Sequence, residues 1–167
     1  DNIDVQFNEN EFTAIMGPSG SGKSTLLHCL AGLDRPTSGQ ILLKDQDIST
    51  LNDKQLTKIR RDSFGFVFQA FNLIPTLTAE ENITLPASIA GRKPDMDWIK
   101  QVVETVDISD RLTHRPNELS GGQQQRVAAA RAMATKPEVI FADEPSGNLD
   151  SKSSKELLTF MKSVVEE

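Results

Sequence analysis

The sequence contains a single cysteine, Cys29, and no tyrosine. One thiol cannot form an internal disulfide, so a disulfide-stapled secreted domain is excluded and a reducing compartment is expected. No apolar run approaches the roughly 20 residues that a membrane-spanning helix needs, and the first residues lack the charged-then-apolar pattern of a leader. If the protein works at a membrane, we expect another chain to hold it there.

Positive charge is also scarce, because 18 Lys and Arg stand against 24 Asp and Glu and give a net charge of −6. This balance argues against a nucleic-acid partner bound over the whole surface, so any polyanion is expected to bind locally. A length of 167 residues, 37% of them apolar, is sufficient for one compact domain with a small subdomain.

One glycine-rich stretch carries a specific chemical pattern, since residues 17–25 read GPSGSGKST. The residues that match the phosphate-binding pattern are Gly17, Gly22, Lys23 and Ser24. Apolar residues 12–16 predict a strand before the loop, and residues 24–32 predict a helix after it. Glycines let backbone amides fold around phosphates, and the helix N-terminus favours negative charge there.

Each residue type in this loop has an expected task. Lys23 should reach the β- and γ-phosphates, and Ser24 should ligate Mg²⁺ through its hydroxyl. The other expected nucleotide-binding residues of the loop are Gly17, Pro18, Ser19, Gly20, Ser21, Gly22 and Thr25. The alternative is a Gly/Ser turn that merely precedes a helix, and the predicted strand on the other side counts against it.

Hydrophobic periodicity divides the chain into an α/β core and a helical insertion. Strands are predicted over residues 3–7, 12–16, 40–43, 64–68 and 139–142. Helices are predicted over residues 24–32, 52–61, 78–90, 95–106, 120–135 and 151–167. No strand signal lies between residues 70 and 116. We therefore expect a mostly parallel core from residues 1–69 and 117–167, with a helical subdomain, residues 70–116, inserted into it.

Two acids, Asp143 and Glu144, follow the predicted strand 139–142. Ligands bind at the carboxyl ends of parallel strands, so Asp143 can hold the Mg²⁺ that Ser24 also ligates. Glu144 is then placed to polarise a water for in-line attack on the γ-phosphate. The alternative is that this acidic pair forms only a solvated turn after the strand. The presence of the phosphate loop favours the functional interpretation.

Residues 119–123 read LSGGQ and are followed by QQRVAAARAM. Together with the phosphate loop and VIFADE at 139–144, they make essentially the whole chain resemble the ATPase subunit of ATP-binding-cassette transporters. SGNLDS at 146–151 and FQAFNLIPTLTAEEN at 68–82 resemble the lipoprotein-release and macrolide-export branch.

The resemblance implies a function and partners for the chain. It implies a P-loop NTPase fold that binds ATP and Mg²⁺ and hydrolyses ATP to power export or extraction of a substrate. It also implies an integral membrane permease as partner, at the cytoplasmic face of the plasma (inner) membrane, and no nucleic acid.

The resemblance further assigns site residues that are ambiguous in isolation. Gln69 is implied to contact the metal or the attacking water and to link the nucleotide to the helical subdomain and the permease. Three residues of the same segment are candidates either for the partner groove or for core burial, namely Phe71, Leu73 and Ile74.

The LSGGQ stretch starts a helix and is therefore a second anion-binding device. The resemblance implies a head-to-tail dimer of ATPase domains, expected to be a homodimer, in which Ser120 and Gly122 of one domain close on the γ-phosphate held by Lys23 of the other. The further residues implied at this shared site are Gly121, Gln123 and Asp150. The alternative for the two glycines is close packing at the helix start.

Two features of the family are missing. The family places an adenine-stacking aromatic before the first residue here and a switch histidine beyond the last, and neither His28 nor His114 is in position to replace the latter. We therefore expect a fragment of a longer protein.

Alternative functions compete with that of a transport ATPase. An ATP-binding module without turnover stays open, whereas a DNA-maintenance head is disfavoured because no sustained heptads separate the phosphate loop from LSGGQ. A GTPase is disfavoured because the chain has no Asn-Lys-x-Asp segment.

Overall fold

A computed structural model describes residues 3–147 and 151–166 of the chain. Its helices are α1 (Lys23–Leu30), α2 (Asp53–Ser63), α3 (Ala79–Ile89), α4 (Met96–Thr105), α5 (Gly121–Met133) and α6 (Ser151–Glu166), with short 3-10 turns η1 (Ser109–Arg111) and η2 (Pro116–Glu118). Its strands are β1 (Leu42–Leu43), β2 (Gln46–Asp47), β3 (Phe64–Phe68) and β4 (Val139–Asp143). Within the described ranges, no helix has both the length and the apolar content to cross a bilayer.

Reciprocal side-chain caps explain where two helices begin. Asn52 accepts a hydrogen bond from the amide of Gln55, whose side chain accepts one from the Asn52 amide. Thr78 and Glu81 make the same pair of bonds at the start of α3. These boxes satisfy amides that a first helical turn leaves without partners, and they confirm the predicted starts of both helices.

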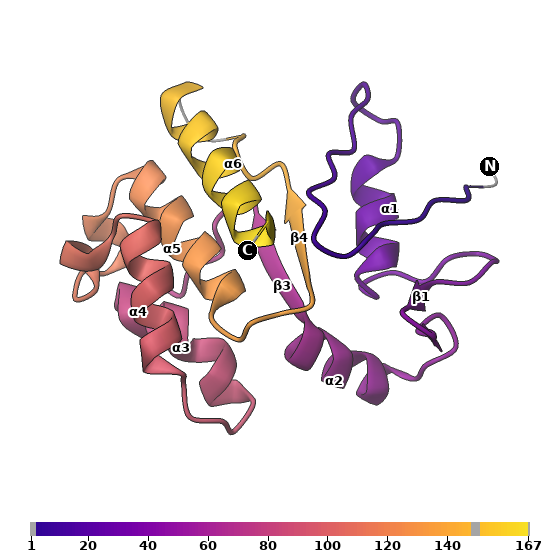
Figure 1. Ribbon diagram of the computed structural model, residues 1–167, viewed down its shortest axis with the longest axis horizontal. Coiled ribbons are helices and arrows are strands. Elements are labelled where there is room, and N and C mark those ends of the chain that lie inside the picture. The colour runs from indigo at the N-terminus through magenta and orange to yellow at the C-terminus, as the bar shows by residue number, and fades with distance from the viewer. Residues whose placement is uncertain (1–2, 148–150, 167) are drawn as a thin grey trace.

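The central sheet consists of β3 and β4, which run parallel with Phe64 opposite Val139 and Phe68 opposite Asp143. The chain crosses from one strand to the other through α3, α4 and α5. In Figure 1 these three helices lie on one side of the strand pair, and α1 and β1 lie on the other. Because the two strands end at the same register, the residues that follow them emerge at one edge of the sheet.

The larger core forms around α5, whose residues Val127 to Ala130 are fully buried. Side chains from α3, α4, β3 and α6 pack in the same cluster. Gly65 of β3 is required here, because a Cβ at this position would lie 2.3 Å from the carbonyl oxygen of Ala132 in α5. The absence of a side chain thus allows α5 to lie directly against the strand.

The strands predicted over residues 3–7 and 12–16 were wrong, because the structure shows no strand in either segment. Their apolar side chains are largely exposed, with Ile3 62% and Met16 89% accessible. A strand needs a hydrogen-bonding neighbour, and none of the described segments pairs with this stretch. The strand predicted over residues 40–43 shortens to β1, which pairs antiparallel with β2. The described structure between residues 70 and 116 contains helices and turns, and the division into two domains stays a prediction.

Candidate active site

The phosphate loop folds into a tight turn immediately before α1. Gly20 and Gly22 have φ angles of 78° and 90°, which lie in the left-handed region that glycine adopts without strain. Gly22 is also the N-cap of α1, so the loop leads directly into the first helical turn. The first amides of a helix have no partner within the helix, and they therefore form a ready site for an anion.

The ammonium of Lys23 bends back over this loop. Its Nζ donates hydrogen bonds of 2.8 Å to the carbonyl oxygens of both Gly17 and Pro18. The other loop residues from Ser19 to Ser21 are exposed, as is Thr25 in the first turn of α1. The predicted loop residues are therefore open to solvent, and the Lys23 ammonium lies against the loop backbone.

Ser24 and Asp143 come together from opposite ends of the sequence. The Ser24 hydroxyl donates a 3.0 Å hydrogen bond to Oδ1 of Asp143, the last residue of β4. The other carboxylate oxygen lies 3.8 Å from Nε2 of His28, one turn further along α1. The packing of α1 against the end of β4 thus brings together the two residues that were predicted to share a metal ion.

Glu144 follows β4 directly and adopts a left-handed backbone conformation, with φ at 46°. Such a conformation costs a non-glycine residue about 1–3 kcal/mol and persists only where the surrounding structure holds it. A turn follows, in which the amide of Gly147 donates a 2.9 Å hydrogen bond to the Glu144 carbonyl. The side chain of Glu144 is exposed at the same edge of the sheet as Ser24 and Asp143.

Gln69 follows β3 at this edge and lies against the turn that follows Glu144. A Cβ at Gly147 would lie 2.8 Å from the side-chain nitrogen of Gln69, so a larger residue at this position would displace the exposed Gln69 side chain. The parallel register explains the proximity, because Phe68 is paired with Asp143 in the ladder. Phe71 and Leu73 in the following segment are half-buried, and Ile74 is 38% exposed.

The LSGGQ residues form a capped helix start. The Ser120 hydroxyl accepts a hydrogen bond from the Gln123 amide, and the Gln123 side chain accepts one from the Ser120 amide. Ser120 and Gly121 are exposed, and Gly122 is half-buried. Among the described contacts, none joins these residues to the phosphate loop of the same chain. Asp150 lies outside the described residues.

The chemical character of the site fits a hard cation and a polyphosphate. A hydroxyl and a carboxylate are oxygen donors of the type that Mg²⁺ prefers. The described residues contain no group of three or more His, Cys, Asp or Glu side chains arranged for a metal ion. Mg²⁺ commonly takes one or two protein ligands and completes its shell with phosphate and water oxygens, so the pair of Ser24 and Asp143 matches this pattern.

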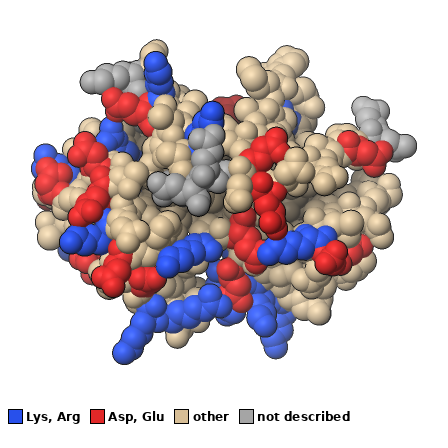
Figure 2. All heavy atoms as spheres, viewed as in Figure 1, with Lys and Arg blue, Asp and Glu red and all other residues tan. Residues whose placement is uncertain are grey.

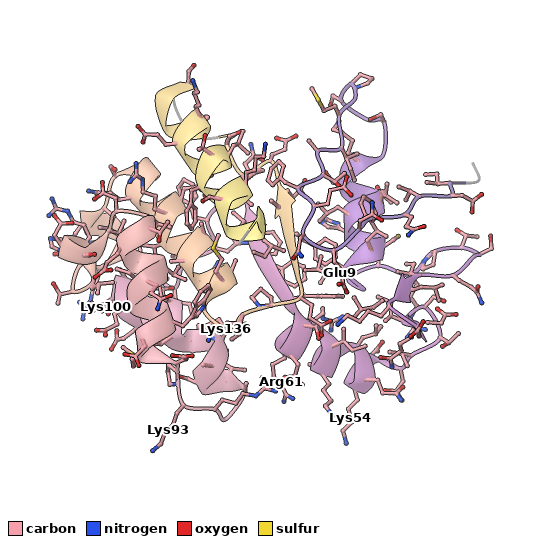
Figure 3. All side chains as sticks on the ribbon, viewed as in Figure 1. Glu9, Lys54, Arg61, Lys93, Lys100 and Lys136 are labelled. Carbon is pink, nitrogen blue, oxygen red and sulfur yellow. The ribbon has the colours of Figure 1, made fainter. Side chains whose placement is uncertain are left out.

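On the face shown in Figure 2, a group of positively charged side chains lies away from this site. Lys and Arg side chains gather along the lower edge of the molecule in Figure 2, over α2 and the connection between α3 and α4. Figure 3 shows Lys54, Arg61 and Lys93 projecting from that edge. The phosphate loop lies at the opposite end, above α1 in Figure 1. The basic edge therefore does not adjoin the phosphate loop that holds Lys23.

The sequence analysis missed two residues near the site, Gln125 and Arg131 of α5. Gln125 donates from Nε2 to the carbonyl of Pro145 at 2.5 Å, and Arg131 donates to the carbonyls of Phe71 and Asn72. The sequence signal that could have identified them is a long polar side chain, Gln125 or Arg131, within the alanine-rich predicted helix 120–135.

Comparison with known proteins gives consistent matches along the chain. A sequence model of the family described as "ABC transporter" matches residues 1–147. The macrolide export ATP-binding/permease protein MacB of Marinobacter nauticus is 49% identical over 161 residues, which are 95% of this chain and 25% of that protein. The lipoprotein-releasing system ATP-binding protein LolD of Cytophaga hutchinsonii is 48% identical over 157 residues, which are 93% of this chain and 72% of that protein.

Solved structures agree with the sequence relatives. The dimeric structure of MJ0796, an ABC transporter cassette of Methanocaldococcus jannaschii, has a TM-score of 0.88 at 45% identity and covers 99% of this chain and 74% of that chain. A second structure of MJ0796, in a post-hydrolysis state bound to ADP and Pi, has a TM-score of 0.87 at 44% identity. These matches confirm the expected P-loop NTPase fold, and the chain belongs to the ABC transporter family as one of its ATP-binding, ATP-hydrolysing domains.

Proposed function

We propose that this domain binds ATP with Mg²⁺ between its phosphate loop and the end of β4, and that its hydrolysis of ATP powers export or extraction of a substrate through a membrane permease. The hydrogen bond between Ser24 and Asp143 carries the proposal. It joins the start of α1 to the strand end beside Glu144, so a metal ligand pair and a candidate base share one edge of the sheet.

Lys23 and the loop amides supply the nucleotide site. The ammonium that now bonds to the carbonyls of Gly17 and Pro18 is released to the β- and γ-phosphates when a nucleotide occupies the loop. Its charge and the amides from Gly20 to Thr25 offset the charge on the phosphate oxygens. The remaining loop positions, Pro18 and Ser19, shape the turn around the phosphates.

Ser24, Asp143 and Gln69 are the residues that would hold Mg²⁺. When bound, Mg²⁺ would supply positive charge that offsets the negative charge developing on the phosphate oxygens during phosphoryl transfer. Ser24 and Asp143 supply a hydroxyl and a carboxylate oxygen, and Gln69 supplies an amide oxygen from the neighbouring strand end.

Glu144 is the proposed general base. Its carboxylate accepts a proton from the water that attacks the γ-phosphate in line, and its strained backbone holds the side chain at the carboxyl edge of the sheet. Gln69 positions the same water through its amide. The contact of Gln69 with the turn at Gly147 keeps Gln69 and Glu144 close to each other.

A second ATPase domain completes the site in this proposal. MJ0796 has been solved as a dimer, which supports dimerisation, and we propose a head-to-tail homodimer. Ser120, Gly121, Gly122 and Gln123 of one domain then face the γ-phosphate held by Lys23 of its partner, and Asp150 lies at the interface. This explains why α5 begins with exposed small residues that make no described contact with their own phosphate loop.

The partner in the membrane is proposed from the relatives. MacB is named as an ATP-binding and permease protein, and LolD as the ATP-binding protein of a lipoprotein-releasing system. We propose that this chain acts at the cytoplasmic face of the plasma membrane against an integral permease, with Phe71, Leu73 and Ile74 near the docking surface. The relatives do not favour a DNA-maintenance head or an ATP-binding module without turnover.

Phosphate release tests the proposal directly. The purified protein should hydrolyse ATP in the presence of Mg²⁺, and Glu144→Gln should bind ATP with unchanged affinity but release phosphate at least about a hundredfold more slowly. Full activity of Glu144→Gln would overturn the role of Glu144, and a protein that binds ATP but never hydrolyses it would overturn the proposed activity.

A further inference from the structure

Helix α5 makes polar contacts with both loops that carry the proposed catalytic residues. It begins directly after Ser120. It packs closely against β3, because Gly65 has no side chain to separate the helix from the strand. Its inner face consists largely of buried alanines. Two long polar side chains, Gln125 and Arg131, depart from this apolar pattern, and each ends on a backbone carbonyl beyond the helix.

Gln125 reaches the turn that follows Glu144. Its side chain is fully buried, and its Nε2 donates a 2.5 Å hydrogen bond to the carbonyl oxygen of Pro145. Pro145 is the residue directly after Glu144, whose backbone is left-handed. Pro145 is half-buried, and a carbonyl that loses its donor in such a place is destabilised, so this bond favours the observed orientation of the turn.

Arg131 reaches the segment that follows Gln69. Its two terminal nitrogens donate to the carbonyl oxygens of Asn72 and Phe71 at 2.6 and 2.9 Å. Burial lowers the pKa of the guanidinium, yet an arginine side chain stays charged in proteins. Phe71 and Asn72 have φ angles of 57° and 49°, so two consecutive non-glycine residues are left-handed. The planar fork of Arg131 binds both carbonyls of this strained pair at once.

The two loops that α5 holds also touch each other. Gly147, at the end of the turn after Glu144, lies directly against the Gln69 amide. A displacement at either contact point of α5 therefore changes the distance between Gln69 and Glu144. The bonds of Gln125 and Arg131 end on residues 145, 71 and 72, so neither side chain supports Lys23 or the backbone amides of the phosphate loop directly.

We propose that Gln125 and Arg131 are positioning residues for ATP hydrolysis. From one helix, α5, Gln125 holds the turn after Glu144 and Arg131 holds the segment after Gln69. This inference rests on the proposed function. It goes beyond that function because it makes hydrolytic geometry in one chain depend on α5, the helix whose first residues face the partner domain. A shift of α5 on dimer closure would then reach both loops together.

Two substitutions and two matched controls test the proposal by kinetics. Gln125→Met keeps the side-chain volume and removes the donor, and Arg131→Lys keeps the charge and removes the fork. The controls are Gln124→Met and Arg126→Lys on the same helix, since Gln124 bonds to the Leu119 carbonyl and Arg126 to the Val106 carbonyl and Glu156. We expect the test variants to lose about tenfold to a hundredfold in kcat with ATP affinity changed less than about threefold, and the controls to stay within about threefold of wild type in both.

Hydrogen exchange provides a readout that needs no activity. The amides of residues 70–74 and of residues 144, 146 and 147 should exchange faster in the test variants than in the controls, with protection in α5 and β3 unchanged. Unchanged kcat and exchange in both test variants would overturn the proposal, as would a loss of protection across the whole of α5 and β3. If wild type hydrolyses no ATP, the proposed function fails, and the exchange comparison still decides whether the two residues position these loops.

Discussion

The hydroxyl of Ser24 lies 3.0 Å from Oδ1 of Asp143, although the two residues are 119 positions apart in the chain. Ser24 is held by the start of α1 and Asp143 by the end of β4, so both positions are determined by regular structure. This pair is the point at which the phosphate loop meets the sheet edge that carries Glu144.

Removal of either member of this pair should weaken the response to Mg²⁺. We expect Ser24→Ala and Asp143→Asn each to raise the Mg²⁺ concentration needed for half-maximal ATP hydrolysis by about tenfold or more, because each removes or weakens an oxygen ligand. Activity measured against Mg²⁺ concentration in both variants and in the double variant checks this. Losses that simply add in the double variant would show that the two residues do not share one ion.

Lys23→Ala should abolish ATP binding or turnover, because it removes the charge that the loop directs to the phosphates. Calorimetric titration with ATP measures the binding, and phosphate release measures the turnover. Lys54→Ala is a suitable control, since Lys54 projects from the opposite edge of the molecule (Figure 3). Equal binding and turnover by wild type and Lys23→Ala would contradict the assigned role.

The proposed dimer should appear in solution when hydrolysis is blocked. Light scattering of Glu144→Gln should show a monomer without nucleotide and a dimer with ATP and Mg²⁺. Adding Ser120→Asp should prevent the dimer, because aspartate still caps the helix but places a negative charge opposite the γ-phosphate. Ser120→Thr retains the cap without the charge and should still allow the dimer. A dimer that forms equally well with Ser120→Asp would exclude Ser120 from the shared site.

Gly65→Ala should destabilise the fold because the added methyl would lie 2.3 Å from the Ala132 carbonyl oxygen. Overpacking of this kind costs about 1–3 kcal/mol, and urea unfolding measures the loss. Gly121→Ala is the matched comparison, since its Cβ meets only the Phe71 ring at 3.9 Å. Its stability should equal or exceed that of wild type, because alanine is the better helix former. Similar midpoints for both variants would contradict the close approach of α5 to β3.

Stability should fall in acid. The pKa of Glu138 is lowered by its bonds to Lys44 and Ser63, that of Asp62 by Arg61, and that of Asp95 by Lys136. A carboxyl whose folded pKa lies below its ordinary value stabilises the fold above that ordinary value, and the contribution is lost as the pH falls through the folded pKa. Unfolding midpoints should therefore decrease as the pH drops below about 4.5.

A substitution identifies one source of this acid sensitivity. Lys44→Met removes the partner of Glu138, whose ion pair measures 2.6 Å, and should make the decrease with pH shallower. An identical pH profile in this variant would show that the ion pair between Lys44 and Glu138 does not contribute to the acid sensitivity.

Local sequence was sufficient for much of the fold. Strands at 64–68 and 139–142, helices beginning near residues 52, 78 and 120, and the glycine-rich turn before Lys23 were all predicted, and each is present. The strands predicted over 3–7 and 12–16 were not found, because alternation describes a segment able to form a strand but says nothing of the neighbour that must pair with it.

The sequence by itself determined the residue types of the candidate site and the local turns and helix starts that carry them, because capping, periodicity and glycine conformations act within a few residues. The tertiary structure brings Ser24 to Asp143, as the motifs predicted. It alone decided that Gln69 lies against the turn after Glu144 and that Gln125 and Arg131 bond to these two loops. These contacts follow from the register of β3 with β4 and from the packing of α1 and α5, and such long-range pairings depend on the whole chain rather than on any one segment of it.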